Sequence, residues 1–282
     1  MGQSFLVDLN LLDLIVRTAE LSPADVVLEV GTGTGSLTTR LAEEAAAVLG
    51  VELDPGFAQL TRELTAALPN VRLVQADILK DKNHLNPAVL ETLERLQQET
   101  PQARLKLVAN LPYVVATPVI SNLLMTDLPF ERMVVTIQWE LAERITAEPS
   151  TKDYNALSVL IQSLADVEIV RRMPPSAFWP RPKVDSAIIR LSPSAAKRAR
   201  IPDLRRWQRF LHDLYLRRRK NLRGVLIILY KDRFTKEQLD ALLERHGFDP
   251  TIRAEALSVE EHLRLCAIIT DTDSTGTAVT PP

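Results

Sequence analysis

The stretch that decides the fold is Leu28-Glu29-Val30-Gly31-Thr32-Gly33-Thr34-Gly35. An apolar run at 26–30 predicts a buried strand before it, and the pattern at 36–44 predicts a helix after it. Glycines at such a turn let the backbone bend sharply and approach a ligand beside the helix N-terminus. A dinucleotide fingerprint would require a further glycine where Ser36 stands. The loop therefore predicts a nucleoside ligand without a pyrophosphate.

Outward from this loop, short β-rich runs alternate with helical patterns. Strands are predicted at 26–30, 47–52, 71–75, 105–109, 132–137, 167–171 and 185–191, and helices at 36–44, 57–67, 87–98, 118–125 and 140–147. This alternation predicts an α/β fold with a mostly parallel sheet that helices cover on both faces. A proline-rich loop joins the last two strands, which predicts an antiparallel pair at the sheet edge.

The pattern changes near Ser192 to charged amphipathic helices, predicted at 202–222, 236–245 and 259–269. We therefore expect a catalytic domain over 1–192, a smaller all-helical domain over 193–270 and a disordered tail over 271–282. Residues 195–235 contain thirteen basic and three acidic side chains and carry a charge of +10, against −2 for the whole chain. Such an asymmetry predicts a surface that faces a polyanion, with a solvated arginine-rich helix face as the alternative.

Acidic residues follow the second and third predicted strands. Glu52 ends the second strand and lies 21 residues after Gly31, where a carboxylate can accept hydrogen bonds from both ribose hydroxyls. Asp77 follows the third strand and can accept from an adenine amino group. The carboxyl ends of parallel strands line one edge, where ligands of open α/β sheets bind. Together with the glycines, the two acids predict an adenosine-containing cofactor.

The run Asn110-Leu111-Pro112-Tyr113 closes the fourth predicted strand at the same edge. The Asn110 amide oxygen is an acceptor, Pro112 stiffens the turn and leaves the Leu111 carbonyl to face a ligand, and Tyr113 offers a flat face to a base. A plain turn with a satisfied core tyrosine remains the alternative.

The composition argues against disulfides, metal sites, membrane spans and secretion. The single cysteine, Cys266, forbids an internal disulfide and a cysteine-based metal cage, and the four histidines lack ligand spacing. No stretch reaches the roughly 20 apolar residues that a membrane span needs. The first residues lack a secretory signal's cationic region, so we expect a cytoplasmic protein with no membrane anchor. From the cysteine and histidine pattern we expect no metal site.

Taken together and in order, the motifs resemble the KsgA family of ribosomal RNA small-subunit adenine N6,N6-dimethyltransferases. The similarity extends over about residues 2–268 and rests on Gly2-Gln3-Ser4-Phe5-Leu6, the 29–35 loop, Val51-Glu52-Leu53-Asp54, Asn110-Leu111-Pro112-Tyr113, the run Phe178-Trp179-Pro180-Arg181-Pro182-Lys183-Val184-Asp185-Ser186-Ala187, and the segments 216–223 and 247–255. Ser4 stands where the family usually has asparagine.

The resemblance implies a class I (Rossmann-like) methyltransferase sheet and an S-adenosylmethionine-dependent enzyme. This enzyme would dimethylate two adjacent adenosines in a hairpin near the 3′ end of small-subunit rRNA. Its partner would be an immature small ribosomal subunit, and the enzyme would be a monomer. By position, Ser4, Leu6, Gly31, Glu52, Asp77 and Asn110 would line the cofactor site. Residues Asn110, Leu111, Pro112 and Tyr113 would form the pocket for the flipped adenine, with Phe178 against the base.

Two alternatives remain open from the sequence. One is the antibiotic-resistance type of enzyme, which methylates a large-subunit rRNA adenine and shares the glycine loop and the Asn-x-Pro-Tyr motif. The other is a non-catalytic ribosome-assembly or transcription-factor relative that binds RNA without methyl transfer. The C-terminal motifs favour the small-subunit enzyme, and the intact 110–113 motif favours catalysis.

Overall fold

The computed structural model describes residues 4–100 and 102–271. The described residues form two compact units, one within Met1–Glu143 and Ala165–Ser194, the other within Arg144–Leu164 and Ala195–Pro282. This division differs from the single boundary expected after residue 192, because the insertion 144–164 packs with the C-terminal helices. Residues 272–282 of the predicted tail lie outside the described residues.

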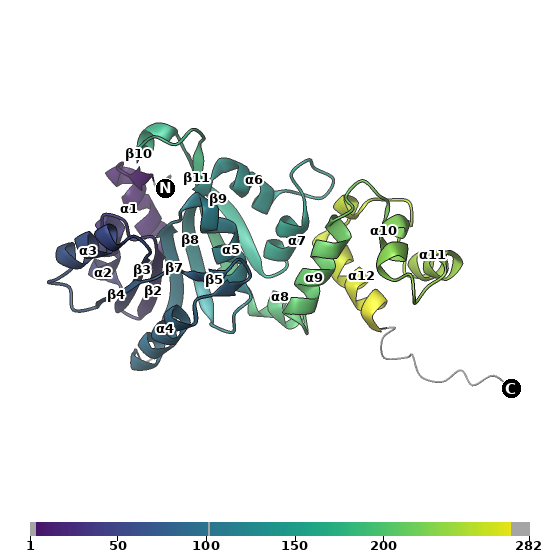
Figure 1. The fold of residues 1–282 in the computed structure, drawn as a ribbon, viewed down its shortest axis with the longest axis horizontal. Coiled ribbons are helices and arrows are strands. Elements are labelled where there is room, and N and C mark those ends of the chain that lie inside the picture. Colours follow the sequence, from purple (N-terminus) through teal and green to yellow (C-terminus); the bar gives the residue numbers. More distant parts are fainter. Residues whose placement is uncertain (1–3, 101, 272–282) are drawn as a thin grey trace. The chain divides into compact units, whose positions relative to one another are not determined.

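The first unit is built on a seven-stranded sheet in the order β4-β3-β2-β7-β8-β11-β9 (Figure 1). Its strands are β2 (Asp25–Val30), β3 (Ala47–Glu52), β4 (Val71–Gln75), β7 (Arg104–Asn110), β8 (Phe130–Gln138), β9 (Ala165–Met173) and β11 (Ser186–Pro193). The first five are parallel, and β11 is antiparallel to both β8 and β9. The predicted α/β class and the antiparallel edge pair are confirmed.

The order of the strands determines where a ligand can bind. The chain runs outward from β2 through β3 to β4 and then returns to place β7 on the other side of β2. Helices that leave neighbouring strands in opposite directions open a crevice at this point, at the carboxyl ends of the strands. The glycine loop after β2 and the Asn110 motif after β7 therefore meet at one edge.

Helices cover the sheet of the first unit. They are α1 (Leu9–Ala19), α2 (Ser36–Glu44), α3 (Pro55–Leu64), α4 (Pro87–Glu99) and α5 (Tyr113–Leu124), and α6 (Trp139–Thr146) follows β8. Helix α1, which the sequence analysis did not predict, is capped by the Asp8 carboxylate. Helix α5 begins at Tyr113, five residues before its predicted start, and contains Pro118 in its interior.

One face of the sheet packs against α1 and α2 in a continuous apolar core. Ile15 of α1, Leu41 of α2, and Val27, Val108 and Ile188 of the strands are all fully buried in it. Two short strands, β1 (Phe5–Leu6) and β10 (Phe178–Trp179), pair antiparallel beside this core, and β10 follows the turn η1 (Pro175–Ala177) (Figure 1). Between β4 and β7, a hairpin of β5 (Leu79–Asp81) and β6 (His84–Leu85) is followed by α4.

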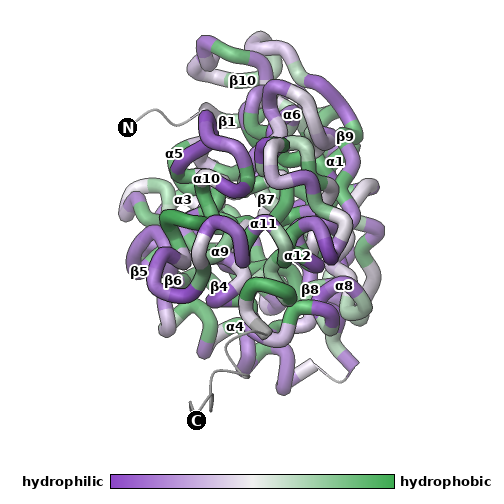
Figure 2. Tube along the Cα trace, turned by 90° about the vertical axis from the view of Figure 1, so that its right-hand side faces the viewer, coloured by the Kyte–Doolittle hydropathy of each residue, from purple (hydrophilic) through white to green (hydrophobic). Residues whose placement is uncertain are grey.

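The second unit is helical. It contains α7 (Ala156–Gln162), α8 (Ala195–Ala199), α9 (Leu204–Tyr215), α10 (Leu222–Leu229), α11 (Lys236–Arg245), the turn η2 (Ala254–Ala256) and α12 (Val259–Asp271). The helix predicted over 202–222 ends at Tyr215 instead, and after a turn the next helix, α10, begins at Leu222. The Asn221 side chain accepts from Gly224 N and caps the start of α10. Hydrophilic and hydrophobic residues alternate along the helices of this unit (Figure 2). No helix in the described residues is long and apolar enough to cross a membrane.

A buried histidine joins three parts of the second unit. His262 Nδ1 donates to Ser258 O (2.8 Å), and His262 Nε2 lies 3.2 Å from Tyr215 Oη. The ring stacks on Tyr215 with centroids 5.8 Å apart and also contacts Tyr154. Its side chain is fully buried, and burial lowers the pKa of His262 to about 4. The imidazole is therefore neutral in the folded unit at neutral pH.

We predict that acid loosens this unit through His262. An unfolded histidine binds a proton near pH 6.5, whereas the folded one does not until about pH 4. Stability contributed by the neutral ring is complete above the unfolded pKa and falls between these values, by on the order of 3 kcal/mol. Hydrogen-exchange protection of α12 should therefore drop as the pH falls from about 6.5 to about 4. His262→Gln should remove most of this pH dependence, and an equal drop in the variant would contradict the assignment.

Candidate active site

The glycine loop is anchored to the neighbouring strand β3. Gly31 N donates to Val51 O (2.8 Å), and Gly33 N donates to Glu52 Oε2 (2.9 Å). Both glycines have positive φ, 80° and 53°, a conformation that side chains with a Cβ rarely adopt. A Cβ on Gly33 would also lie 2.9 Å from the Phe5 ring. The loop thus requires glycine for both its conformation and its packing.

Glu52 retains the capacity to accept from a ligand. Its side chain is 5% exposed, and Oε1 accepts from Asp54 N (3.0 Å) while Oε2 accepts from Gly33 N. An ionised carboxylate offers about four acceptor sites, so roughly two remain for hydroxyl donors. This geometry fits the predicted contact with a ribose.

A cavity of about 980 Å³ opens beside Glu52. Its walls include the apolar side chains Val51, Leu53 and Ile78, and Asp77 lies at its solvent-exposed side with Oδ1 accepting from Leu79 N (2.9 Å). Apolar walls with a few placed acceptors are what a purine nucleoside requires. The residues present therefore fit the adenosine part of the expected cofactor.

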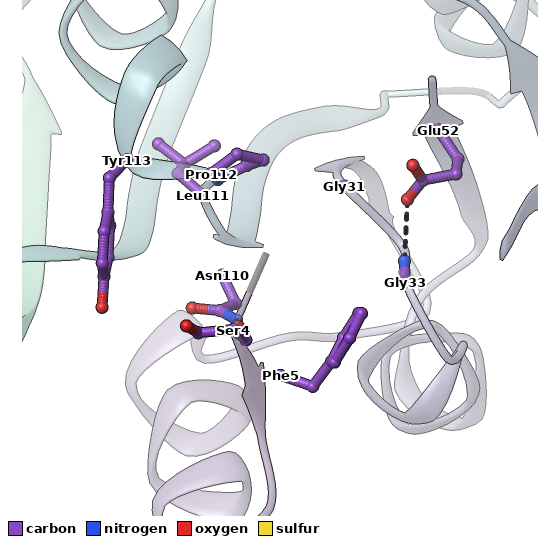
Figure 3. Close-up of a pocket in the computed structure, with 9 residues that line it drawn as sticks. All are labelled: Ser4, Phe5, Gly31, Gly33, Glu52, Asn110, Leu111, Pro112 and Tyr113. Carbon is purple, nitrogen blue, oxygen red and sulfur yellow. Dashed lines mark hydrogen bonds between the residues drawn. The ribbon is translucent and has the colours of Figure 1, made fainter. Parts of the chain in front are cut away.

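A second pocket, of about 430 Å³, adjoins the glycine loop (Figure 3). It brings together seven of the predicted site residues, which are Ser4, Gly31, Glu52, Asn110, Leu111, Pro112 and Tyr113. Phe5 and Gly33 complete its lining. Gly31 and Glu52 border both cavities, so the two are neighbours around one loop. The middle of a molecule that spans both cavities would therefore contact the glycine loop.

The Asn110 carboxamide is oriented by the N-terminal segment. Asn110 Nδ2 donates to the main-chain oxygen of Ser4 (3.1 Å), and its Oδ1 has no hydrogen-bond donor in the described part of the chain. Figure 3 shows this oxygen on the side of Tyr113, away from Phe5. Because Ser4 contributes its backbone, the contact does not depend on the asparagine that the family usually has there. The structure thus leaves an acceptor free beside the pocket.

Tyr113 joins the two most specific motifs of the sequence. Its hydroxyl lies 2.6 Å from the hydroxyl of Ser186, which is fully buried at the start of β11. Burial raises the pKa of the half-buried Tyr113 phenol, so it stays protonated at neutral pH. The Ser186 contact holds the ring beside Asn110, and Tyr113 lines both cavities.

Phe178 does not lie with the other predicted site residues. Its side chain is 2% exposed and packs into the core with Ile15 and Met173. In the β1–β10 ladder it pairs with Leu6, which is partly buried against the same core and also borders a third pocket of about 410 Å³. The buried position of Phe178 therefore does not support its predicted stacking on the flipped base.

Two residues that line the site were missed by sequence reasoning. Phe5 covers Gly33, and its only signal is its place in the Gly-Gln-x-Phe-Leu motif. Glu29 borders the third pocket and is only 1% exposed. Burial raises the pKa of its carboxyl group to about 8, and its Oε2 has no hydrogen-bond partner in the described residues. A carboxyl group that is largely protonated at neutral pH can donate a hydrogen bond. The glycine motif contains Glu29, but sequence alone does not show its burial.

The second unit displays exposed cations around the α9–α10 connection. Exposed side chains include Arg209, Arg217, Arg219 and Lys220, none of which forms an ion pair within the described residues. Other cations of this segment are paired: Arg223 lies 2.5 Å from Asp240, and Arg200 pairs with Glu260. The predicted +10 segment therefore contains a subset of unpaired cations that can meet phosphates. No cluster of metal ligands occurs in the described residues.

Comparison with known proteins agrees with this geometry. The chain is 39% identical over 272 residues to the ribosomal RNA small subunit methyltransferase A of Clostridium botulinum (strain Langeland / NCTC 10281 / Type F), covering 96% of this chain and 93% of that one. It is 40% identical over 266 residues to the protein of the same name from Ligilactobacillus salivarius (strain UCC118), covering 94% and 87%.

Solved structures share the fold over the same extent. The 23S rRNA methyltransferase ErmE is 28% identical with a TM-score of 0.65, covering 94% of this chain and 99% of that chain. A dimethyladenosine transferase from Plasmodium falciparum has a TM-score of 0.79 at 23% identity and shares the fold over 96% of this chain and 98% of its own.

The family described as ribosomal RNA adenine dimethylase matches residues 1–271. This match confirms the predicted family, the Rossmann-like methyltransferase fold and the prediction of an S-adenosylmethionine-dependent enzyme. With the glycine loop, Glu52 and the Asn110 motif gathered at one edge of the sheet, the chain belongs to the ribosomal RNA adenine dimethylase family.

Proposed function

We propose that this chain dimethylates the N6 amino groups of two adjacent adenosines near the 3′ end of small-subunit rRNA, using S-adenosylmethionine. The observation that carries the proposal is the Asn110 carboxamide, fixed by Ser4 O beside the glycine loop with its oxygen free of protein donors. The relatives at 38–40% identity are named small subunit methyltransferases, which favours this subunit. The substrate is an immature small ribosomal subunit, and the enzyme acts as a cytoplasmic monomer.

The cofactor site comprises Ser4, Leu6, Gly31, Glu52, Asp77 and Asn110. Glu52 accepts from the ribose, Asp77 accepts from the purine amino group and the apolar walls of the larger cavity cover the purine face. When bound, the cofactor supplies a methyl group on a sulfonium. Gly31 and Gly33 keep the loop free of side chains so that the methionine portion can approach the backbone.

The adenine pocket consists of Asn110, Leu111, Pro112 and Tyr113. An adenine amino nitrogen is a weak nucleophile because its lone pair is delocalised into the ring. Hydrogen bonds from its N–H groups to Asn110 Oδ1 and the Leu111 carbonyl favour a pyramidal nitrogen and stabilise the positive charge that develops on it. The Tyr113 ring supplies a stacking face for the target adenine after the adenine has left the base stack of the RNA. No general base is required, since the product nitrogen is acidic enough to lose its proton to water.

ErmE, a 23S rRNA methyltransferase, is 28% identical over almost the whole chain, which favours the large-subunit reaction as the second candidate. Incubating separate small and large ribosomal subunits with labelled cofactor, followed by mapping of the methyl groups, separates the two. Label in adjacent adenosines of the small-subunit 3′ hairpin supports the proposal, and label confined to the large subunit overturns it.

We predict that Asn110→Ala binds the cofactor nearly as well as the wild type but transfers methyl groups at least about 100-fold more slowly. The alanine removes the acceptor for the amino group and leaves Glu52 and the glycine loop intact. Single-turnover methylation measures the rate, and calorimetry measures cofactor affinity. Ser4→Ala is the matched control, because Ser4 acts through its main-chain oxygen and should keep the wild-type rate. A wild-type rate in Asn110→Ala would contradict the role.

We predict that Gly33→Ala weakens cofactor binding by at least 10-fold. Both positive φ and the 2.9 Å approach of its Cβ to Phe5 would displace the loop. The control is Gly247→Ala, which has a similar positive φ of 76° but no atom within 4 Å of its Cβ, in the other unit. Equal cofactor affinity in the two variants would show that the loop conformation does not matter for binding.

We predict that replacing three unpaired cations, Arg217, Arg219 and Lys220, by glutamine weakens binding to small subunits and makes it less sensitive to salt. Each phosphate contact that is lost lowers the slope of log K against log salt by about 0.7 to 0.9. A control that replaces three exposed cations of the first unit, Arg62, Arg72 and Arg95, should keep the wild-type slope. Unchanged salt dependence in the first triple variant argues against this surface as the RNA contact.

A further inference from the structure

The short β1–β10 ladder determines which side chains near the site face outward. Phe5 is paired with Trp179, and Leu6 is paired with Phe178. Directly opposed residues of an antiparallel pair place their side chains on the same face, and successive residues alternate between faces. Leu6 and Phe178 pack inward on the core, so Phe5 and Trp179 share the other face.

That other face is the one that borders the active site. Phe5 contacts the position of Gly33, lies 4.8 Å from the Phe57 ring between centroids, and lines the pocket that contains Asn110. Trp179 continues the same face outward from Phe5. Its side chain is 68% exposed, and no ring or cation contact to it occurs in the described residues.

The other two tryptophans of the chain are covered. Trp139 has the Arg172 guanidinium 4.5 Å from its ring centroid, and Arg172 is itself held by Asp185 (2.6 Å). Trp207 is buried and donates through Nε1 to Ser163 Oγ (3.0 Å). A large aromatic ring left in water keeps its apolar area hydrated, so a flat ligand that covers the ring gains free energy.

The charges around Trp179 favour a ligand that has both an aromatic ring and negative charge. Arg181 and Lys183 follow it in the same loop, both exposed and without an ion pair among the residues described. The prolines Pro180 and Pro182 restrict the backbone between them, which lowers the entropy lost on binding. An aromatic face flanked by cations is the arrangement that holds a single-stranded nucleotide.

We propose that Trp179 is a stacking platform for the nucleobase that neighbours the target adenosine. The inference rests on the proposed function, in which one adenosine is in the pocket while its neighbour has lost a stacking partner. Trp179 supplies the replacement face, and Arg181 and Lys183 contact the adjoining phosphates. Trp179 is thus a positioning residue for the RNA, which sets how the target adenosine is presented to Asn110.

The test compares Trp179→Ala, Trp179→Phe and Trp139→Phe on an rRNA hairpin. Trp179→Ala should raise KM for the RNA about 10-fold, leave cofactor affinity unchanged and change kcat little. Trp179→Phe, which keeps a flat ring, should restore most of the loss. Trp139→Phe, whose ring is covered in the wild type, should behave as the wild type.

A second readout does not require methyl transfer. The fluorescent base 2-aminopurine replaces the neighbour of the target adenosine, and its emission should fall on binding the wild type and Trp179→Phe but not Trp179→Ala. Equal quenching and equal KM in Trp179→Ala and the wild type overturn the inference and leave the proposed function intact. Failure of the wild type to methylate small-subunit adenosines would instead overturn the proposed function.

Discussion

The hydrogen bond from Gly33 N to the Glu52 carboxylate is the interaction on which the site depends. It ties the loop after β2 to the end of β3, so that the backbone of the loop and the carboxylate are held together before any ligand binds. The bond forms because β2 and β3 are parallel neighbours in register, from Val26 opposite Ala47 to Val30 opposite Val51. Groups held in place by secondary structure lose little entropy on binding, which is how a rigid sheet edge supports a precise site.

A second constraint comes from the N-terminal segment. Ser4 and Phe5 close over the loop, where Ser4 O orients the Asn110 amide and Phe5 covers Gly33. The segment is in turn held by pairing with β10, whose Phe178 is anchored in the core. The most specific motifs of the sequence, far apart along the chain, therefore support one another physically, as the Tyr113–Ser186 contact also shows.

Local sequence patterns predicted the structure most accurately where they alone determine it. The strand at 47–52 and the helix at 36–44 have the predicted bounds, because continuous apolar runs and glycine boundaries are strong local signals. Local patterns predicted less where turns and packing override them. The helix expected over 202–222 ends at Tyr215, and residues 144–164 pack with the C-terminal helices through contacts such as Trp207 with Ser163.

The sequence by itself determined the α/β fold, the order of the strands along the chain and the set of motifs at their ends, since periodicity and residue type are local properties. Which side chains those motifs present was decided only by the tertiary structure. Phe178 and Trp179 are adjacent aromatic residues, yet one is 2% exposed and the other 68%. The physical reason is the alternation of side chains along a paired strand, whose inward face is set by the partner Leu6 and the core behind it.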